Sequence, residues 1–179
     1  MKGYRSKLNF HYNFLLSLIS TEQIAIFMEE IFMNIHLARS NDLEAISECV
    51  NTAYSMYISR LGKKPASMVT NYSELIANGV VHVVLEKEEL KGLIVLIPKT
   101  NYLLLKNLAV HPRFQGQGIG RKLIEFAIEY AETRNLEEVR LYTNELMSEN
   151  LEYYPKFGFV ETDRRTEDGF NRVYMTKKL

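Results

Sequence analysis

The chain has 179 residues, of which 46% are hydrophobic and 25% are charged, and its 22 basic and 22 acidic side chains cancel. This length suits one α/β domain with a single large core, and the ordinary composition excludes a disordered or fibrous protein. A balanced charge without long runs of one sign gives no electrostatic footprint for nucleic acid or an anionic membrane, so a small molecule or a peptide fits better as partner.

Residues 1–32 precede the segment that reads as a domain. Their apolar run at 14–19 is short, is interrupted by Ser17 and has no small-residue cleavage site after it, so neither a signal peptide nor a membrane span is expected. Apolar side chains at helical spacing instead predict an amphipathic extension that packs on the domain or on a second subunit in a homodimer. These side chains are Leu15, Leu18, Ile19, Ile24, Phe27, Met28 and Ile31. Residues 33–179 are expected to form the functional domain.

The first half of that domain reads as helices and a strand meander. Asn41 and Glu44 form a capping-box pattern at the start of a helix that continues to Tyr57. A loop at 62–65 leads to a second short helix that ends at Asn78. Aliphatic and β-branched runs predict strands at 34–39, 80–85, 93–97 and 102–110, with a charged turn over 86–92.

The second half predicts two further helices and three strands. The helices are expected to open at 116–120 and to cover 144–156, and the strands to cover 138–143, 157–162 and 173–177, with Asp168-Gly169 as a turn. The fold class is therefore α/β, a mixed sheet with helices on both faces.

The most informative segment, 110–121, joins a strand to a helix. Gly116, Gly118 and Gly120 let the backbone approach a ligand, and the first amides of the helix point outward, which suits phosphate oxygens. The residues expected around a pyrophosphate are Gln115, Gly116, Gln117, Gly118, Ile119, Gly120 and Arg121. The G-x-G-x-G spacing differs from the dinucleotide fingerprint G-x-G-x-x-G, and Gly120 is followed by Arg121 and Lys122 rather than by the Lys-Ser/Thr of a Walker A loop.

Residues 115–120, preceded by Val110-x-Pro112, resemble the signature Q/R-x-x-G-x-G/A of the GNAT superfamily of N-acetyltransferases. Residues 150–159 are similar to the tyrosine-containing helix followed by Gly-Phe near the end of such domains. The resemblance spans residues 33–179 and implies a GNAT-like fold with a central, mostly antiparallel sheet. It also implies that acetyl-CoA is the acetyl donor.

The resemblance further implies a V-shaped gap between the strand that ends at Val110 and the strand 138–143. The pantetheine arm would bond there to the backbone of Leu108, Ala109 and Val110, and a backbone N–H near Ala109 or Val110 would stabilise the oxyanion. Tyr154 matches the family's general acid, although an aromatic residue on a helix is usually part of the core. Asn150, one turn earlier, would bond the pantetheine or lie exposed.

The general base and the acceptor site are less defined. Many relatives carry a glutamate on the strand before the glycine loop, whereas this chain has Lys106 and Asn107 there, so the base is left unassigned. Candidate substitutes are Glu145, Glu149, His82 and His111. The resemblance assigns the acceptor side to Tyr54, Tyr57, Arg60 and the loop 62–65, closed by Tyr142, Asn144, Arg165 and Arg172. Tyrosines and arginines suit an amine that also carries a carboxylate, although helix-surface tyrosines and solvated arginines are the ordinary alternative.

The single cysteine, Cys49, excludes an intrachain disulfide, reads as a buried structural thiol and suits a reducing cytoplasm. The four histidines lie far apart in sequence, so no metal site is expected. The resemblance thus implies an N-acetyltransferase that moves an acetyl group from acetyl-CoA to a primary amine of a small molecule or peptide by direct attack. The alternative is a non-catalytic acyl-CoA-binding or regulatory module of the same fold.

Overall fold

The computed structural model describes residues 35–86 and 88–179, and Ile35–Leu179 forms one compact unit. The expected helical extension over residues 1–32, with its role in a homodimer, lies outside the described residues. The boundary between extension and domain therefore stays a prediction.

Seven strands of the described residues form one sheet in the order β1-β2-β3-β4-β5-β7-β6, in which β4 and β5 are parallel and the other pairs are antiparallel. The strands are β1 Ile35–Leu37, β2 Val81–Glu86, β3 Glu89–Pro98, β4 Tyr102–Val110, β5 Glu138–Asn144, β6 Val160–Glu167 and β7 Phe170–Lys178. The α-helices are α3 Leu43–Tyr54, α4 Met56–Leu61, α5 Tyr72–Ala77, α6 Ile119–Glu132 and α7 Ser148–Tyr153. Short 3-10 helices are η1 Ser40–Asp42, η2 Ala66–Val69, η3 Pro112–Phe114 and η4 Tyr154–Phe157. The expected mixed, mostly antiparallel sheet is confirmed.

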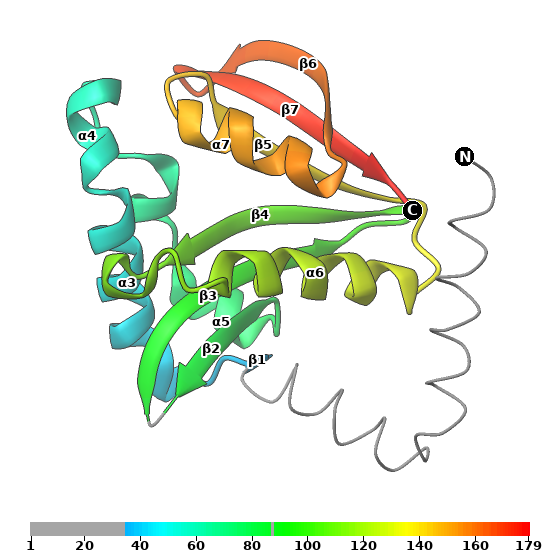
Figure 1. Cartoon of the computed structure of the whole chain (residues 1–179). Coiled ribbons are helices and arrows are strands. Elements are labelled where there is room, and N and C mark those ends of the chain that lie inside the picture. The colour runs from blue at the N-terminus through cyan, green and yellow to red at the C-terminus, as the bar shows by residue number, and fades with distance from the viewer. Residues whose placement is uncertain (1–34, 87) are drawn as a thin grey trace. The chain divides into compact units, whose positions relative to one another are not determined.

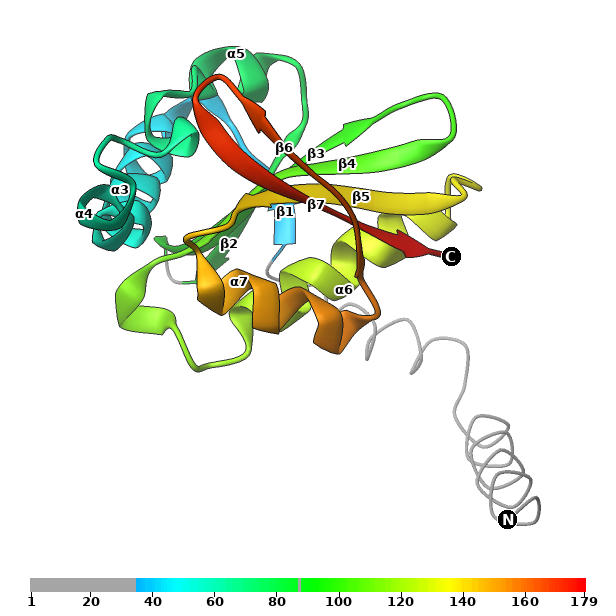
Figure 2. The same cartoon turned by 90° about the horizontal axis from the view of Figure 1, so that it is seen from above.

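Helices cover both faces of the sheet (Figures 1 and 2). The apolar stripe of α6, with Leu123, Ile124 and Ala127, is buried against β4, β5 and β7, and α7 packs on the same core. On the other face, α3 and α5 bury Ile46 and Tyr72 against β2 and β3. In α3 and α6 the apolar residues recur with the helical period of about 3.6, so each helix has one apolar face. Each of these faces covers one side of the sheet, which explains the layering.

Three expected boundaries were wrong in detail. The capping bond at the first helix runs from the Arg39 N–H to Asp42, 2.7 Å, so the turn begins before the expected cap Asn41. The turn after β2 is shorter than 86–92, because Glu88 adopts a φ of 64° and β3 already begins at residue 89. The expected helix 144–156 is divided into α7 and η4, and Gly158 with a φ of 86° delays the next strand to residue 160.

β4 carries one residue more than β3 at Lys106. Leu105 and Asn107 pair with consecutive residues of β3, so Lys106 forms a β-bulge. Because side chains alternate between the faces of a sheet, one extra residue exchanges the faces for the rest of the strand. Leu105 accordingly belongs to the core under α6, whereas Ala109 belongs to the core under α3.

Candidate functional site

The sheet opens between its two parallel strands. Pairing of β4 with β5 ends at Leu105 and Leu141. Beyond that point β4 stays paired with β3 as far as Val110, and β5 stays paired with β7 as far as Asn144. The two strands therefore diverge, as Figure 1 shows, and leave a gap between them.

The outer half of β4 presents backbone groups to this gap. Alternate residues of an antiparallel strand exchange hydrogen bonds with the partner strand, and the others turn the opposite way. The N–H of His111 donates to the Lys91 carbonyl at 2.9 Å, so Ala109, two residues earlier, also bonds to β3. Leu108 and Val110 consequently direct their N–H and C=O groups into the gap. Of the three residues expected to bond pantetheine, Ala109 thus has its backbone groups turned away.

A side chain approaches each of the two carbonyl oxygens that face the gap. The Gln115 amide donates to the Val110 carbonyl at 3.1 Å, and the Tyr54 hydroxyl lies 3.0 Å from the Leu108 carbonyl oxygen. The N–H groups of Leu108 and Val110 face the same gap. They are donors placed for a ligand that lies along the strand.

The glycine loop needs its glycines for two different reasons. Gly116 and Gly118 adopt left-handed backbone angles, with φ of 77° and 81°, which disfavour other residues. Gly120 is limited by space instead, because an added Cβ would lie 2.9 Å from the Tyr153 hydroxyl oxygen. Gln117 donates to the Arg113 carbonyl at 3.3 Å and so braces the turn.

The start of α6 leaves its first amides without a side-chain cap. Gly118 is the N-cap residue and has no side chain, and the first helical bond is made by Lys122, whose N–H lies 3.0 Å from the Gly118 carbonyl. The N–H groups of Ile119, Gly120 and Arg121 therefore have no partner within the helix. Together with the helix dipole they form a site that suits phosphate oxygens.

A cleft of about 460 Å³, here called the loop cleft, runs from this loop along β4 to α7. It is lined by Ala53, Tyr54, Tyr57, Leu108, Ala109, Val110, Phe114, Gln115, Gly116, Gly118, Ile119, Gly120, Arg121, Glu149, Asn150, Tyr153 and Tyr154. All the expected cofactor residues thus lie together in one cleft except Gln117, which is absent from its lining.

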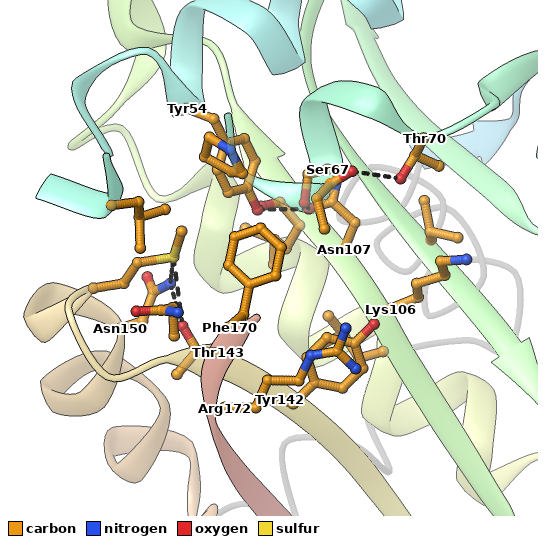
Figure 3. Close-up of a pocket in the computed structure, with 18 of the residues that line it drawn as sticks. Tyr54, Ser67, Thr70, Lys106, Asn107, Tyr142, Thr143, Asn150, Phe170 and Arg172 are labelled. Atoms are coloured by element: carbon orange, nitrogen blue, oxygen red, sulfur yellow. Dashed lines mark hydrogen bonds between the residues drawn. The ribbon is translucent and has the colours of Figure 1, made fainter. Parts of the chain in front are cut away.

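A second, smaller cavity of about 100 Å³, the inner pocket, lies between the diverging strands and the segment η2–α5 (Figure 3). Its lining includes Ser67, Thr70, Tyr72, Lys106, Asn107, Tyr142, Thr143, Asn144, Met147, Phe170 and Arg172. Four residues line both cavities: Tyr54, Leu108, Asn150 and Tyr154. These four mark the place where the cavities meet.

Tyr154 lies buried at this junction. Its side chain is 7% exposed, and its ring packs edge-on against Phe159 with centroids 5.8 Å apart. Burial, together with the nearby Tyr54, raises the pKa of Tyr154 well above its usual range, so the hydroxyl stays protonated. Among residues 35–86 and 88–179 this hydroxyl has no hydrogen-bond partner, which leaves its proton available to a ligand.

Asn107 holds a buried polar network beside the junction. Its Oδ1 accepts from the hydroxyls of Tyr54 at 2.5 Å and Ser67 at 3.1 Å. Its Nδ2 donates to the Tyr72 hydroxyl at 2.8 Å, which in turn donates to the Ser67 carbonyl at 3.1 Å. Burial raises the pKa of Tyr54 to about 12, so this group is a neutral donor. This network was not predicted from the sequence, although a polar residue within the apolar run of β4 was a signal for it.

The residues expected on the acceptor side divide between the two cavities. Tyr142 and Asn144 line the inner pocket, whereas Tyr57 lines the loop cleft instead. Arg60 lines neither cavity, and its guanidinium bonds the carboxylate of Glu149, which lines the loop cleft, at 2.7 and 2.9 Å. Arg165 lies elsewhere on the sheet, with its guanidinium 4.2 Å from the centre of the Tyr174 ring.

The candidate bases do not reach the inner pocket. The pKa of Glu149 is held below its usual range by a hydrogen bond from its own backbone N–H and by Arg60. His82 packs between Phe126 and Tyr130 of α6, and burial lowers its pKa to about 4. The two remaining candidates bond elsewhere: Glu145 accepts from Asn171, and the His111 Nδ1 accepts from the Arg113 N–H. The described residues that line the inner pocket include no aspartate, glutamate or histidine.

Residues 77–161, which run from the end of α5 to the start of β6, match the family model described as the acetyltransferase (GNAT) domain. The matched segment, which contains the glycine loop and β4, is thus similar to GNAT acetyltransferases. An uncharacterized N-acetyltransferase of Methanocaldococcus jannaschii is 36% identical over 67 residues, which make up 37% of this chain and 30% of that protein. The chain thus spans about 30% of the length of this curated relative.

Solved structures share the fold. The PaiA N-acetyltransferase of Thermoplasma acidophilum, in complex with coenzyme A, aligns with a TM-score of 0.69 and 21% identity over 81% of this chain and 98% of that chain. A GNAT family acetyltransferase of Elizabethkingia anophelis with acetyl-CoA bound aligns with a TM-score of 0.61 and 21% identity over 81% of this chain and 97% of that one. At these identities the likeness establishes the architecture of the chain.

None of the helices in residues 35–86 and 88–179 combines the length and the apolar character needed to span a membrane. The same residues contain no group of three or more histidine, cysteine, aspartate or glutamate side chains placed to hold a metal ion.

Proposed function

We propose that this protein is an N-acetyltransferase that moves an acetyl group from acetyl-CoA to a primary amine of a small molecule or peptide. The observation that carries the proposal is the junction of the two cavities, where Tyr154 and the backbone of Leu108 meet. A donor in the loop cleft and an acceptor in the inner pocket would be in contact only there. Two solved structures with this fold contain coenzyme A and acetyl-CoA, which supports acetyl-CoA as the donor.

The loop cleft would hold the donor through its backbone. The uncapped amides at the start of α6 would bind the pyrophosphate, with the exposed Arg121 side chain at their edge. The N–H groups of Leu108 and Val110 would bond the pantetheine arm and the thioester oxygen, and Asn150 lies within the same lining. The side-chain amides of Gln115 and Gln117 stabilise the loop through hydrogen bonds to backbone carbonyls.

The reaction would proceed by direct attack. The lone pair of a neutral acceptor amine attacks the thioester carbonyl carbon, and an N–H of β4 stabilises the negative charge that develops on oxygen. The C–S bond then breaks with its electron pair on sulfur, Tyr154 supplies the proton that makes the departing thiol neutral, and solvent returns a proton to Tyr154. The proton lost by the amine passes to solvent, because no carboxylate or imidazole lines the inner pocket in the described chain.

Calorimetric titration with acetyl-CoA, alongside NAD and ATP, tests the donor site. Selective binding of acetyl-CoA is expected, and a Gly118→Ala variant should bind it more weakly because the loop must change shape. Release of free thiol from acetyl-CoA in the presence of an amine panel then tests turnover. Equal binding of all three nucleotides, or of none, would refute the assignment of acetyl-CoA as the donor.

A non-catalytic acyl-CoA-binding module is the second candidate, and the inner pocket without acidic or imidazole groups is the observation that favours it. Such a module would bind acetyl-CoA but release no thiol with any amine. The unpartnered hydroxyl of Tyr154 favours the enzyme instead.

We also propose that the protein works in a reducing cytoplasm and that it forms a homodimer. Cys49 is buried, and burial raises the pKa of its thiol to about 12, which makes it unreactive and compatible with a reducing cytoplasm. A homodimer through residues 1–32 would be tested by measuring the oligomeric mass in solution of the intact protein and of a chain without these residues. The same number of chains per particle in both proteins would refute the dimer proposal.

A further inference from the structure

The inner pocket has an unusual charge distribution for a site that receives an amine. Carboxylates that could pair with an ammonium are absent from its lining within the described residues. Two residues with cationic side chains are among those that line it, Lys106 and Arg172. A pocket that selected polycationic acceptors would be expected to show the opposite sign.

The two cations differ in how far their charge is already matched. The Arg172 guanidinium bonds the Glu167 carboxylate at 2.8 Å and the Asp168 carboxylate at 2.7 Å, and it stacks 4.5 Å from the centre of the Tyr142 ring. The Lys106 ammonium has no ion pair or hydrogen bond with any residue of 35–86 and 88–179. Lys106 is therefore the unmatched charge of the pocket.

The bulge in β4 accounts for the position of Lys106. It is the extra residue of the strand and lies directly after Leu105, the last residue of β4 that pairs with β5. Bulges redirect side chains and end strand pairing, so the same irregularity that starts the fork also places the lysine at its closed end. In Figure 3, Tyr54 and Asn150 lie toward the left of the pocket, Arg172 lies below it, and Lys106 lies on the right with its ammonium pointing away from the other labelled side chains.

We infer that the acceptor is a small molecule or chain terminus that carries an anionic group, such as a carboxylate, a few bonds from its amine. This inference rests on the proposed acetyltransferase function. The amine lies at the junction beside Tyr54 and Tyr154, and the anion lies toward Lys106. The cavity volume of about 100 Å³ limits the part between them. A cavity of about 150 Å³ holds a benzene ring, so this one accepts a chain of roughly four non-hydrogen atoms.

The positive charge also suits the chemistry of attack. A nearby cation disfavours the ammonium form of the acceptor and so lowers the pKa of its amine. More of the bound amine is then neutral and able to attack without a base in the pocket. The anion of the acceptor offsets the cost of bringing this molecule next to Lys106.

Matched acceptor pairs test the inference. Glycine, β-alanine, 4-aminobutyrate and 5-aminovalerate are each compared with the corresponding carboxamide, using thiol release from acetyl-CoA by the full chain. At least one carboxylate is expected to exceed its carboxamide in kcat/KM by about tenfold, the size of one hydrogen bond to a charged group. Equal use of the two members in every pair, or preference for the carboxamides, would overturn the inference.

Variants then assign the preference to Lys106. Lys106→Gln should bring the carboxylate-to-carboxamide ratio close to one, and Lys106→Glu should move the preference to diamines of the same length. Lys99→Gln, which removes an exposed lysine at the turn between β3 and β4, should leave the ratio as it is. A Lys106→Gln variant that lowers both members of each pair equally would show that this lysine does not recognise the anion.

Failure of the inference can be told apart from failure of the proposed function. If acetyl-CoA does not bind, the function falls and the inference falls with it. If acetyl-CoA binds but no acceptor reacts, the inference is tested by binding alone. Calorimetry then compares the affinity of the CoA-loaded protein for N-acetyl-β-alanine with its affinity for the corresponding carboxamide. The carboxylate should bind about tenfold more tightly. Equal or absent binding of the two would overturn the inference while the donor site stands.

Discussion

Replacing Tyr154 by phenylalanine separates chemistry from binding and from folding. The variant keeps the ring that packs against Phe159, and it removes a hydroxyl that has no partner in the described residues. No protein group is left unsatisfied, so the free energy of unfolding should change by less than about 0.5 kcal/mol. The CoA dissociation constant should also stay within about twofold, because the expected binding contacts come from the backbone.

Turnover of the same variant should fall strongly. A positioned general acid contributes roughly 10²- to 10⁴-fold, which corresponds to about 3–5 kcal/mol in the activation barrier. Thiol release at saturating acetyl-CoA measures this loss. Because burial raises the pKa of Tyr154, kcat of the wild type should not decline on the alkaline side up to about pH 9 through loss of this proton.

Tyr72→Phe is the matched control, since it removes a buried tyrosine hydroxyl that is fully bonded. Its loss leaves the Asn107 amide and the Ser67 carbonyl without a partner, which should destabilise the fold by about 1–3 kcal/mol. Urea unfolding measures the difference between the two variants. A Tyr154→Phe enzyme with kcat within about threefold of wild type would refute the role of Tyr154 as proton donor.

Three further outcomes follow from the structure. Gly118→Ala should destabilise the fold by about 1–2 kcal/mol because of its φ of 81°, and Gly118→Asn should cost less because asparagine tolerates that conformation; urea midpoints of the two variants compare them. The pKa of His82 is about 4 in the folded protein, below the ordinary value of 6.5, so stability present above pH 6.5 should be lost as the pH falls toward 4. Over this pH range the free energy of unfolding of His82→Gln should fall by about 2 kcal/mol less than that of the wild type. Parallel plots of the free energy of unfolding against pH for the two proteins would contradict the assignment. Arg60→Gln should change stability by less than about 1 kcal/mol and the acceptor KM by less than about threefold, because this exposed arginine pairs with Glu149 rather than lining the inner pocket; a tenfold rise in the acceptor KM would restore it as an acceptor residue.

Local patterns were enough to predict most of the elements. The strand 102–110 and the turn at Asp168-Gly169 agree with the structure because aliphatic runs and turn residues act over a few positions. The placement of the glycine loop between β4 and α6 followed from the same kind of signal. The capping position at Asn41 was wrong because Asp42 satisfies the Arg39 N–H instead.

Features that depend on distant contacts could not be read from spacing. Arg60 was assigned to the acceptor side, but its partner Glu149 is 89 positions away, and only the fold brings α4 beside α7. The bulge at Lys106 was equally invisible, since an extra residue is defined only by the register of the neighbouring strand. The roles of Tyr154 and the other site residues remain predictions that the experiments above decide.

The bulge also determines how this strand tolerates changes of length. Deletion of Lys106 would make the strand regular, because Leu105 and Asn107 already pair with the consecutive residues Leu96 and Val95 of β3. Alternation would then keep Leu105 under α6 and Asn107 on the face where it bonds Tyr54 and Tyr72. A chain shortened by this single residue would lose the cation and the local bend of the bulge but not the facing of the strand, whereas loss of a residue elsewhere in β4 would shift its register.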